Sequence, residues 1–156
     1  MLALLSLGSN LGDRVQNLIS AIAALTNHVE VLAAAPLYET APVGNVAQPD
    51  FVNTAVKVSF EQTPQELLEI IHDIEMQHGR TRDVHWGPRT LDIDIIDVQG
   101  FSCDGADLQI PHPRAKERSF VTVPCADIAP TWSLTTETPS RDGVTRIDDA
   151  RWLVQL

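Results

Sequence analysis

Residues 51–60 read FVNTAVKVSF, a segment in which bulky apolar side chains recur at every second position. Alternate residues of a β-strand share a face, so this pattern predicts a strand with one face in a hydrophobic core. The core face would carry Val52, Thr54, Val56, Val58 and Phe60, and the other face Phe51, Asn53, Ala55, Lys57 and Ser59.

A helix is expected directly after this strand. The run Thr63-Pro64-Gln65-Glu66 is a capping box with proline at the first helical position. Apolar residues continue from Leu67 to Ile74, and Gly79 is placed as the cap at the carboxyl end.

The rest of the chain adds strands and helices on both sides of this unit. Upstream we expect a strand over 2–7, a helix whose apolar positions run from Leu11 to Leu25, a strand over 29–38 and a long loop over 40–50. Downstream we expect a strand over 91–98, a hairpin strand near 108–110 and a short helix over 114–120. The order β-α-β-β-α-β predicts an α+β, ferredoxin-like core in a single domain, residues 1–156. Its sheet would be largely antiparallel, both helices would lie on one face, and a C-terminal extension would follow.

Composition limits the class of function. Of 156 residues, 11 are Lys or Arg and 21 are Asp or Glu, so the formal net charge is −10. This charge argues against a nucleic-acid partner, whose binding depends on neutralising phosphates. No apolar run reaches membrane-spanning length, and Cys103 and Cys125 lack metal spacing. We therefore expect a cytoplasmic protein with two reduced cysteines and no membrane partner.

Two carboxylates in the strand over 91–98 are the first candidate site. Asp92 and Asp94 are expected on one face, with Cα atoms roughly 7 Å apart, whereas Asp97 has the opposite parity and is expected only to end the strand. Mg²⁺ is commonly bound by one or two carboxylates together with substrate phosphates. A solvated polar strand face explains the same pattern, and this alternative stays open.

Two basic segments flank these carboxylates. Residues 79–89 hold Arg80, Arg82 and Arg89 together with glycines and a proline, and guanidinium groups bind phosphate oxygens in pairs. A second segment, residues 111–118, holds His112 and Arg118. A solvated loop and a basic helix face that balances an acidic protein are the alternatives.

Four motifs together resemble the 6-hydroxymethyl-7,8-dihydropterin pyrophosphokinase family, and the resemblance runs from about Met1 to Pro130. They are Gly8-Ser9-Asn10-Leu11-Gly12, Gly79-Arg80-Thr81-Arg82, Trp86-Gly87-Pro88-Arg89-Thr90-Leu91-Asp92-Ile93-Asp94-Ile95 and Pro111-His112-Pro113-Arg114. The resemblance implies transfer of diphosphate from ATP to the pterin hydroxymethyl group in folate biosynthesis, with release of AMP. It also implies small-molecule substrates only, and it favours a monomer.

The resemblance assigns roles to individual residues. Asp92 and Asp94 match the aspartates that hold two Mg²⁺ ions, and Arg80, Arg82 and Arg89 match catalytic arginines that contact ATP. Three further residues match nucleotide contacts of the family: Glu75, His112 and Arg118. Eight residues match its pterin contacts: Thr40, Ala41, Pro42, Val43, Phe51, Asn53, Trp86 and Phe120. Phe51 and Asn53 also share a strand face by parity alone.

Two positions depart from the family pattern. His85 stands where the family usually has arginine, and Ala41 replaces a frequent proline. Three alternative functions stay open: a non-catalytic nucleotide-binding module, a kinase that transfers a single phosphoryl group, and a diverged relative that acts on another pterin, the last because of His85.

Overall fold

The computed structural model describes residues 1–42, 47–79, 90–135 and 138–153. The helices and strands follow in the order β1 (Leu2–Ser9), α1 (Arg14–Leu25), β2 (Glu30–Ala34), β3 (Leu37–Thr40), β4 (Phe51–Ser59), α2 (Pro64–Gln77), β5 (Asp92–Val98), β6 (Cys103–Asp104), β7 (Gln109–Ile110), η1 (Ala115–Glu117), α3 (Ser119–Ile128), η2 (Ser133–Thr135), β8 (Val144–Ile147) and α4 (Ala150–Leu153).

The main sheet is antiparallel throughout its described pairs. Its strand order is β5-β1-β4-β3-β8, and β2 also pairs with β4. Strand β4 separates β1 from β2 and β3, while β1 separates β4 from β5. Each βαβ unit is thus split by an antiparallel strand, which confirms the predicted α+β, ferredoxin-like core.

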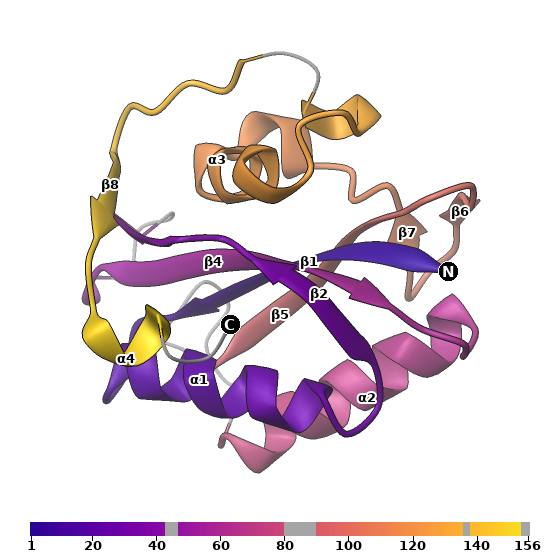
Figure 1. The fold of residues 1–156 in the computed structure, drawn as a ribbon, viewed down its shortest axis with the longest axis horizontal. Helices are drawn as coiled ribbons and strands as arrows, with labels where there is room; N and C mark the ends of the chain where they lie inside the picture. Colours follow the sequence, from indigo (N-terminus) through magenta and orange to yellow (C-terminus); the bar gives the residue numbers. More distant parts are fainter. Residues whose placement is uncertain (43–46, 80–89, 136–137, 154–156) are drawn as a thin grey trace.

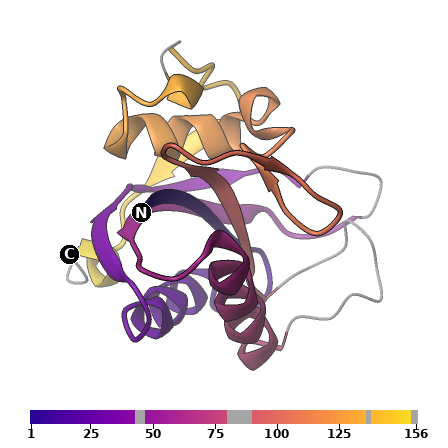
Figure 2. The same ribbon diagram turned by 90° about the vertical axis from the view of Figure 1, so that its right-hand side faces the viewer.

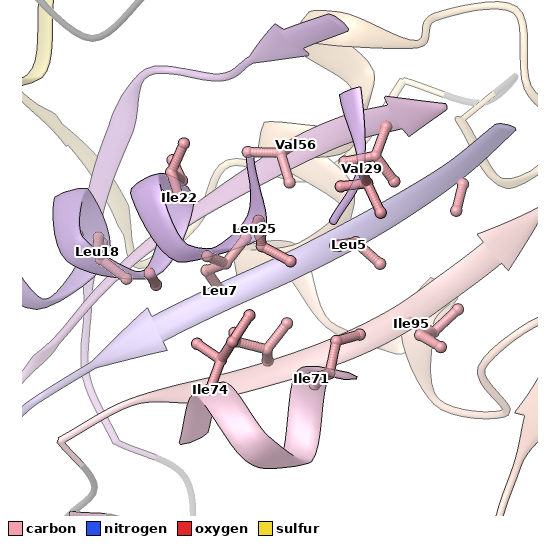
Figure 3. Packing of buried hydrophobic residues seen from close by; sticks show 14 of the residues in the cluster. Leu5, Leu7, Leu18, Ile22, Leu25, Val29, Val56, Ile71, Ile74 and Ile95 are labelled. Carbon is pink, nitrogen blue, oxygen red and sulfur yellow. The ribbon is translucent and has the colours of Figure 1, made fainter. Parts of the chain in front are cut away.

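Three layers make up the fold. Helices α1 and α2 cover one face of the sheet, and α3 covers the other (Figures 1 and 2). The larger core lies between the sheet and α1 and α2, where Leu5, Leu25 and Ile71 are completely buried (Figure 3). A second core, with Leu4, Ala55 and Val121, lies beneath α3. Both faces of the sheet are therefore covered by helices.

The strand over 51–60 matches its prediction. Val52, Val56, Val58 and Phe60 belong to the larger core, and Ala55 belongs to the core on the other face. The capping box of α2 is also confirmed. The Glu66 N–H donates to Thr63 Oγ1 at 3.1 Å, and the Thr63 N–H donates to Glu66 Oε1 at 3.0 Å.

The predicted strand over 29–38 is wrong as a single element. It divides into β2 and β3, which pair with opposite ends of β4. Pro36 lies between them and has no N–H to donate to a ladder, which accounts for the break. The first helix also begins later than expected. Asp13 caps it by accepting the Gln16 N–H, and Leu11 stays exposed.

The predicted helix over 114–120 is also wrong. A 3₁₀ turn, η1, occupies Ala115–Glu117, and α3 then runs on to Ile128. Helix α3 is apolar on most of its surface and contains Pro124, so its sequence lacks the amphipathic period that marks a surface helix.

Asp97 faces the opposite way from the prediction. A β-bulge shifts the register between β1 and β5, so that Asp97 pairs with Leu4 while Ile95 pairs with Leu5. Cross-strand partners share a face, and Leu4 lies in the core beneath α3. Asp97 thus points to the same face as Asp94, because the extra residue inverts the alternation.

Cys103 and Cys125 are both free, as expected, and burial raises the pKa of the Cys125 thiol to about 12. Among the described residues, no helix has the length and apolar character needed to cross a bilayer.

Candidate active site

Strand β5 positions the two carboxylates. Ile93 and Ile95 are buried in the core against α1 and α2, so Asp92 and Asp94 point to the opposite face, and both are partly exposed. Asp92 pairs with Gly8 of β1, and Asp94 pairs with Ser6. The predicted shared face of Asp92 and Asp94 is confirmed.

The same register places a buried amide across β1 from the carboxylates. Gly8 pairs with Asp92 on one side and with Asn53 of β4 on the other. Asn53 is buried, and its Nδ2 donates to Thr40 Oγ1 at 2.6 Å. Asp92, Gly8 and Asn53 thus form one row on one sheet face, which joins the predicted metal and pterin residues.

Gly8 makes this row possible. A Cβ atom added at Gly8 would lie 2.7 Å from Asn53 Oδ1 and 3.5 Å from Phe51 Cδ1. The Asn53 amide and the edge of the Phe51 ring therefore lie over the backbone of β1, where only glycine leaves room. The sequence showed Gly8 only as part of a motif, because neither its spacing nor its residue type reveals what lies across the strand.

Gly8→Ala is expected to weaken, about tenfold, binding of the pterin that the family resemblance implies, because misplacing a binding group by a fraction of an ångström is costly. Isothermal titration with the pterin measures the effect in Gly8→Ala, in Asn53→Ala and in the double variant. The glycine change should add nothing once the Asn53 amide is gone. Additive losses in the double variant would show that Gly8 acts by another route.

A cavity of about 580 Å³ is connected to the Asn53 end of this row through Thr40, although Gly8, Asn53 and Asp92 do not line it. Four of the predicted site residues line it: Thr40, Ala41, Arg118 and Phe120. The Arg118 guanidinium carbon lies 5.7 Å from the centroid of the Phe120 ring. Because this distance allows a cation–π contact, Arg118 and Phe120 restrain each other at the cavity wall. Phe51 faces Thr40 across the β3–β4 ladder.

His112 lies at the start of the second basic segment, near the carboxylates. Its backbone N–H donates to the Ile96 carbonyl at 2.8 Å, and its Nδ1 accepts the Arg114 N–H at 3.2 Å. Burial lowers the pKa of His112, the cations of Arg118 and Arg114 lower it further, and Asp92 opposes them. His112 is therefore neutral at neutral pH, with Nε2 as the nitrogen that carries the proton.

The lowered pKa of His112 predicts a pH dependence of stability. Below the ordinary histidine pKa of about 6.5, His112 binds a proton in the unfolded chain but stays neutral in the folded protein. The free energy of unfolding should therefore fall as pH drops from that value toward the lower pKa of His112. Urea titrations between pH 7.5 and 5 (a range chosen around that pKa) should show that the free energy of unfolding falls less in His112→Gln than in the parent protein. An equal loss in both proteins would contradict this account.

Glu75 links α2 to the edge of β5. It is buried, and its Oε2 accepts the N–H of Ile93, the residue between the two carboxylates, at 2.9 Å. This bond satisfies a donor of the outermost strand in the sheet order. The structure thus gives Glu75 a part in holding β5, beside its expected role at the nucleotide.

Several predicted residues lie outside the described ranges. These are Val43, Arg80, Arg82, Trp86 and Arg89, together with the departure at His85. Pro42 is described and is partly buried at the end of the segment that follows β3.

Within the described residues, no group of three or more His, Cys, Asp or Glu side chains could hold a metal ion. Asp92 and Asp94 are two partly exposed carboxylates on one face of β5. This donor set suits Mg²⁺, which keeps several waters and binds through one or two carboxylates together with phosphates.

Known proteins of one family are similar to this chain. A family model described as 7,8-dihydro-6-hydroxymethylpterin-pyrophosphokinase (HPPK) matches residues 4–130. The chain is 45% identical over 129 residues to the 2-amino-4-hydroxy-6-hydroxymethyldihydropteridine pyrophosphokinase of Bacillus subtilis, covering 81% of this chain and 77% of the relative. It is 40% identical over 148 residues to the enzyme of the same name from Methylorubrum extorquens, covering 94% and 93%.

A solved structure supports the fold. The crystal structure of wild-type Plasmodium falciparum HPPK-DHPS with SDX-DHP matches 94% of this chain and 47% of its own, with a TM-score of 0.63 and 16% identity. At this identity the likeness concerns the fold alone. The family match and the two bacterial relatives decide the identity: the chain belongs to the 7,8-dihydro-6-hydroxymethylpterin-pyrophosphokinase family.

Proposed function

We propose that this protein transfers diphosphate from Mg-ATP to the hydroxymethyl oxygen of 6-hydroxymethyl-7,8-dihydropterin and releases AMP, as a step of folate biosynthesis. The row Asp92–Gly8–Asn53 carries the proposal, because it aligns a carboxylate site and a buried amide on one sheet face. Family membership and the names of both bacterial relatives support the same reaction.

Asp92 and Asp94 would hold the magnesium. Their placement on one face of β5 brings together two carboxylates, and Mg²⁺ is commonly bound by one or two carboxylates together with phosphates. We propose that two Mg²⁺ ions bind at this pair. They would neutralise charge on the triphosphate and lower the barrier to attack at its β-phosphorus. Glu75 keeps the strand between the carboxylates in place through the Ile93 N–H.

Asn53 orients the pterin. Its Nδ2 is fixed by Thr40, so its Oδ1 keeps one direction above Gly8. An amide held in this way can accept from a donor on the edge of a flat heterocycle. Phe51 and Phe120 supply aromatic faces for the ring, and the proposal adds the backbone of Thr40, Ala41, Pro42 and Val43, with Trp86 closing over the ring.

The nucleotide is bound by the basic side chains around the carboxylates. Neutral His112 can donate from Nε2, and Arg118 adds charge at the cavity wall. We assign Arg80, Arg82 and Arg89 to the phosphates and to the charge that develops in the transition state. Arginine suits this role, because its planar fork binds two phosphate oxygens at once.

The reaction then needs no covalent intermediate with the protein. The pterin hydroxymethyl oxygen attacks the β-phosphorus, the bond from that phosphorus to the α-phosphate oxygen breaks, and AMP leaves with the electron pair. The hydroxyl proton passes to solvent. Catalysis consists of alignment and charge neutralisation, of which alignment alone can supply about 7–11 kcal/mol.

A product assay tests this function. Purified protein is incubated with Mg-ATP and the hydroxymethyl dihydropterin, and the nucleotides are separated by anion-exchange chromatography. AMP in equal amount to consumed pterin is expected. ADP would indicate transfer of a single phosphoryl group, and no nucleotide product would indicate a binding module. Turnover with another pterin only would indicate a diverged relative.

We also propose that residues 1–156 act as one domain, as a monomer, in the cytoplasm. The two free cysteines suit a reducing compartment. Light scattering after gel filtration tests the monomer against a dimer of twice the mass.

A further inference from the structure

Residues 138–153, here called the C-terminal arm, pass from the α3 side of the molecule along the outer edge of the sheet as β8 and end in α4, beside α1 (Figure 1). They lie beyond residues 4–130, which the family model matches. Strand β8 of the arm pairs with β3, and its register places Val144 opposite Thr40. The strand that ends at the candidate pterin site therefore has partners on both sides, β4 and β8.

The far end of the arm is anchored in the core. Trp152 is buried with residues of α1 and the sheet, and its indole N–H donates to the Ala35 carbonyl at 2.9 Å. Arg151 donates to Asp13, the residue that caps α1, at 3.0 Å. Because buried tryptophan side chains contribute strongly to packing, this end is fixed rather than loosely attached.

The near end of the arm is tied to α3. Arg141 lies 3.5 Å from a carboxylate oxygen of Asp127 and 3.5 Å from the Tyr38 hydroxyl. Tyr38 in turn donates to Asp127. These contacts join the arm, β3 and α3 on the face of the sheet that carries the candidate site.

Between its two anchors, the arm forms part of the cavity wall. Asp142, Gly143 and Val144 line the 580 Å³ cavity together with Thr40 and Phe120. Thr40 also accepts the hydrogen bond that fixes Asn53. A continuous set of contacts thus leads from Trp152 through the β8–β3 pairing to the Asn53 amide.

We propose that the C-terminal arm is a positioning element for the pterin: it holds the Thr40 end of β3 in register and closes the outer wall of the pocket. This inference rests on the proposed function for the identity of the ligand. It assigns the arm no contact with the phosphates. Because β8 pairs with β3, whereas Arg118 lies across the same cavity, loosening the arm should weaken binding of the pterin far more than binding of Mg-ATP.

Three variants test this inference. Trp152→Ala removes the anchor, Trp152→Phe keeps an aromatic ring without the N–H donor, and Arg141→Ala removes the exposed tie. Leu25→Ala is the control, because it too truncates a buried residue of the same core, at the opposite end of α1 from Asp13. All measurements are made well below the melting temperature of the least stable variant.

Trp152→Ala is expected to raise the Kd for the pterin about tenfold, as positioning losses typically do, with the Kd for Mg-ATP within about twofold of the parent value. Trp152→Phe and Arg141→Ala should have Kd values for the pterin between those of Trp152→Ala and the parent. Leu25→Ala should change neither the Kd for the pterin nor the Kd for Mg-ATP. An equal loss of affinity for both ligands in Trp152→Ala, or the same loss of pterin affinity in Leu25→Ala, would mean that the arm contributes only to general stability. Either result would overturn the proposal.

Hydrogen exchange without ligands separates this inference from the proposed function. Peptides that cover 37–42 should exchange faster in Trp152→Ala than in Leu25→Ala, whatever ligand the site accepts. Unchanged exchange in these peptides would contradict the positioning role. A parent protein that binds no pterin would contradict the proposed function and leave the exchange result standing.

Discussion

Asp94→Asn is expected to lower kcat by about 10³-fold, because it removes one carboxylate of the proposed two-carboxylate metal site, on which charge neutralisation would depend. Asparagine has the same shape as aspartate but carries no negative charge. Asp94 is partly exposed on the sheet face, opposite the buried Ile93 and Ile95. The substitution should therefore leave the melting temperature almost unchanged, and Asp92→Asn should behave in the same way.

Asp97→Asn is the matched control for this prediction. Asp97 lies on the same strand and, through the β-bulge, on the same face, but its cross-strand partner is Leu4 rather than Gly8 or Ser6. Burial raises the pKa of Asp97, so a neutral amide suits its position. The turnover of Asp97→Asn should match that of the parent protein. Near-normal turnover in folded Asp94→Asn at low Mg²⁺ concentration would exclude the metal assignment.

Asn53→Ala is expected to raise the KM for the pterin about 100-fold, since a site built around a hydrogen bond loses much of its affinity when one partner is removed. The amide is buried and held by Thr40, so water cannot simply replace it. The KM for Mg-ATP should stay the same, because Asn53 lies across β1 from the carboxylates.

Steady-state kinetics with each substrate varied in turn measure this selectivity. Asn27→Ala serves as the control, because it removes an exposed amide just beyond the carboxyl end of α1. Comparable increases in both KM values of Asn53→Ala would mean that the residue supports the site as a whole and does not bind the pterin.

The sequence predicted those parts of the fold whose signals are local. The alternation over 51–60 and the capping box before α2 each depend on neighbouring residues, and both match the structure. The division between β2 and β3 depended on Pro36, which the apolar run around it obscured. Helix α3 carries no amphipathic period because it is apolar on most of its surface, so only tertiary packing defines its length.

In the candidate site too, the sequence predicted the features that depend on neighbouring residues and missed those that depend on distant ones. Strand parity correctly placed Asp92 with Asp94, but it failed at Asp97, because a β-bulge leaves no mark in the residue pattern. Gly8 and the C-terminal arm could not be assigned from the sequence. Their roles arise from which strands become neighbours, which depends on contacts between residues far apart in the chain.

ATP labelled at the β-phosphorus gives the most direct test of the proposed reaction. Attack at that phosphorus predicts that the label leaves the nucleotide and appears in the pterin product, while AMP carries none. The same experiment with Asp94→Asn should show almost no transfer. A label that remains with the nucleotide, as ADP, while the pterin gains a single phosphate would contradict the account.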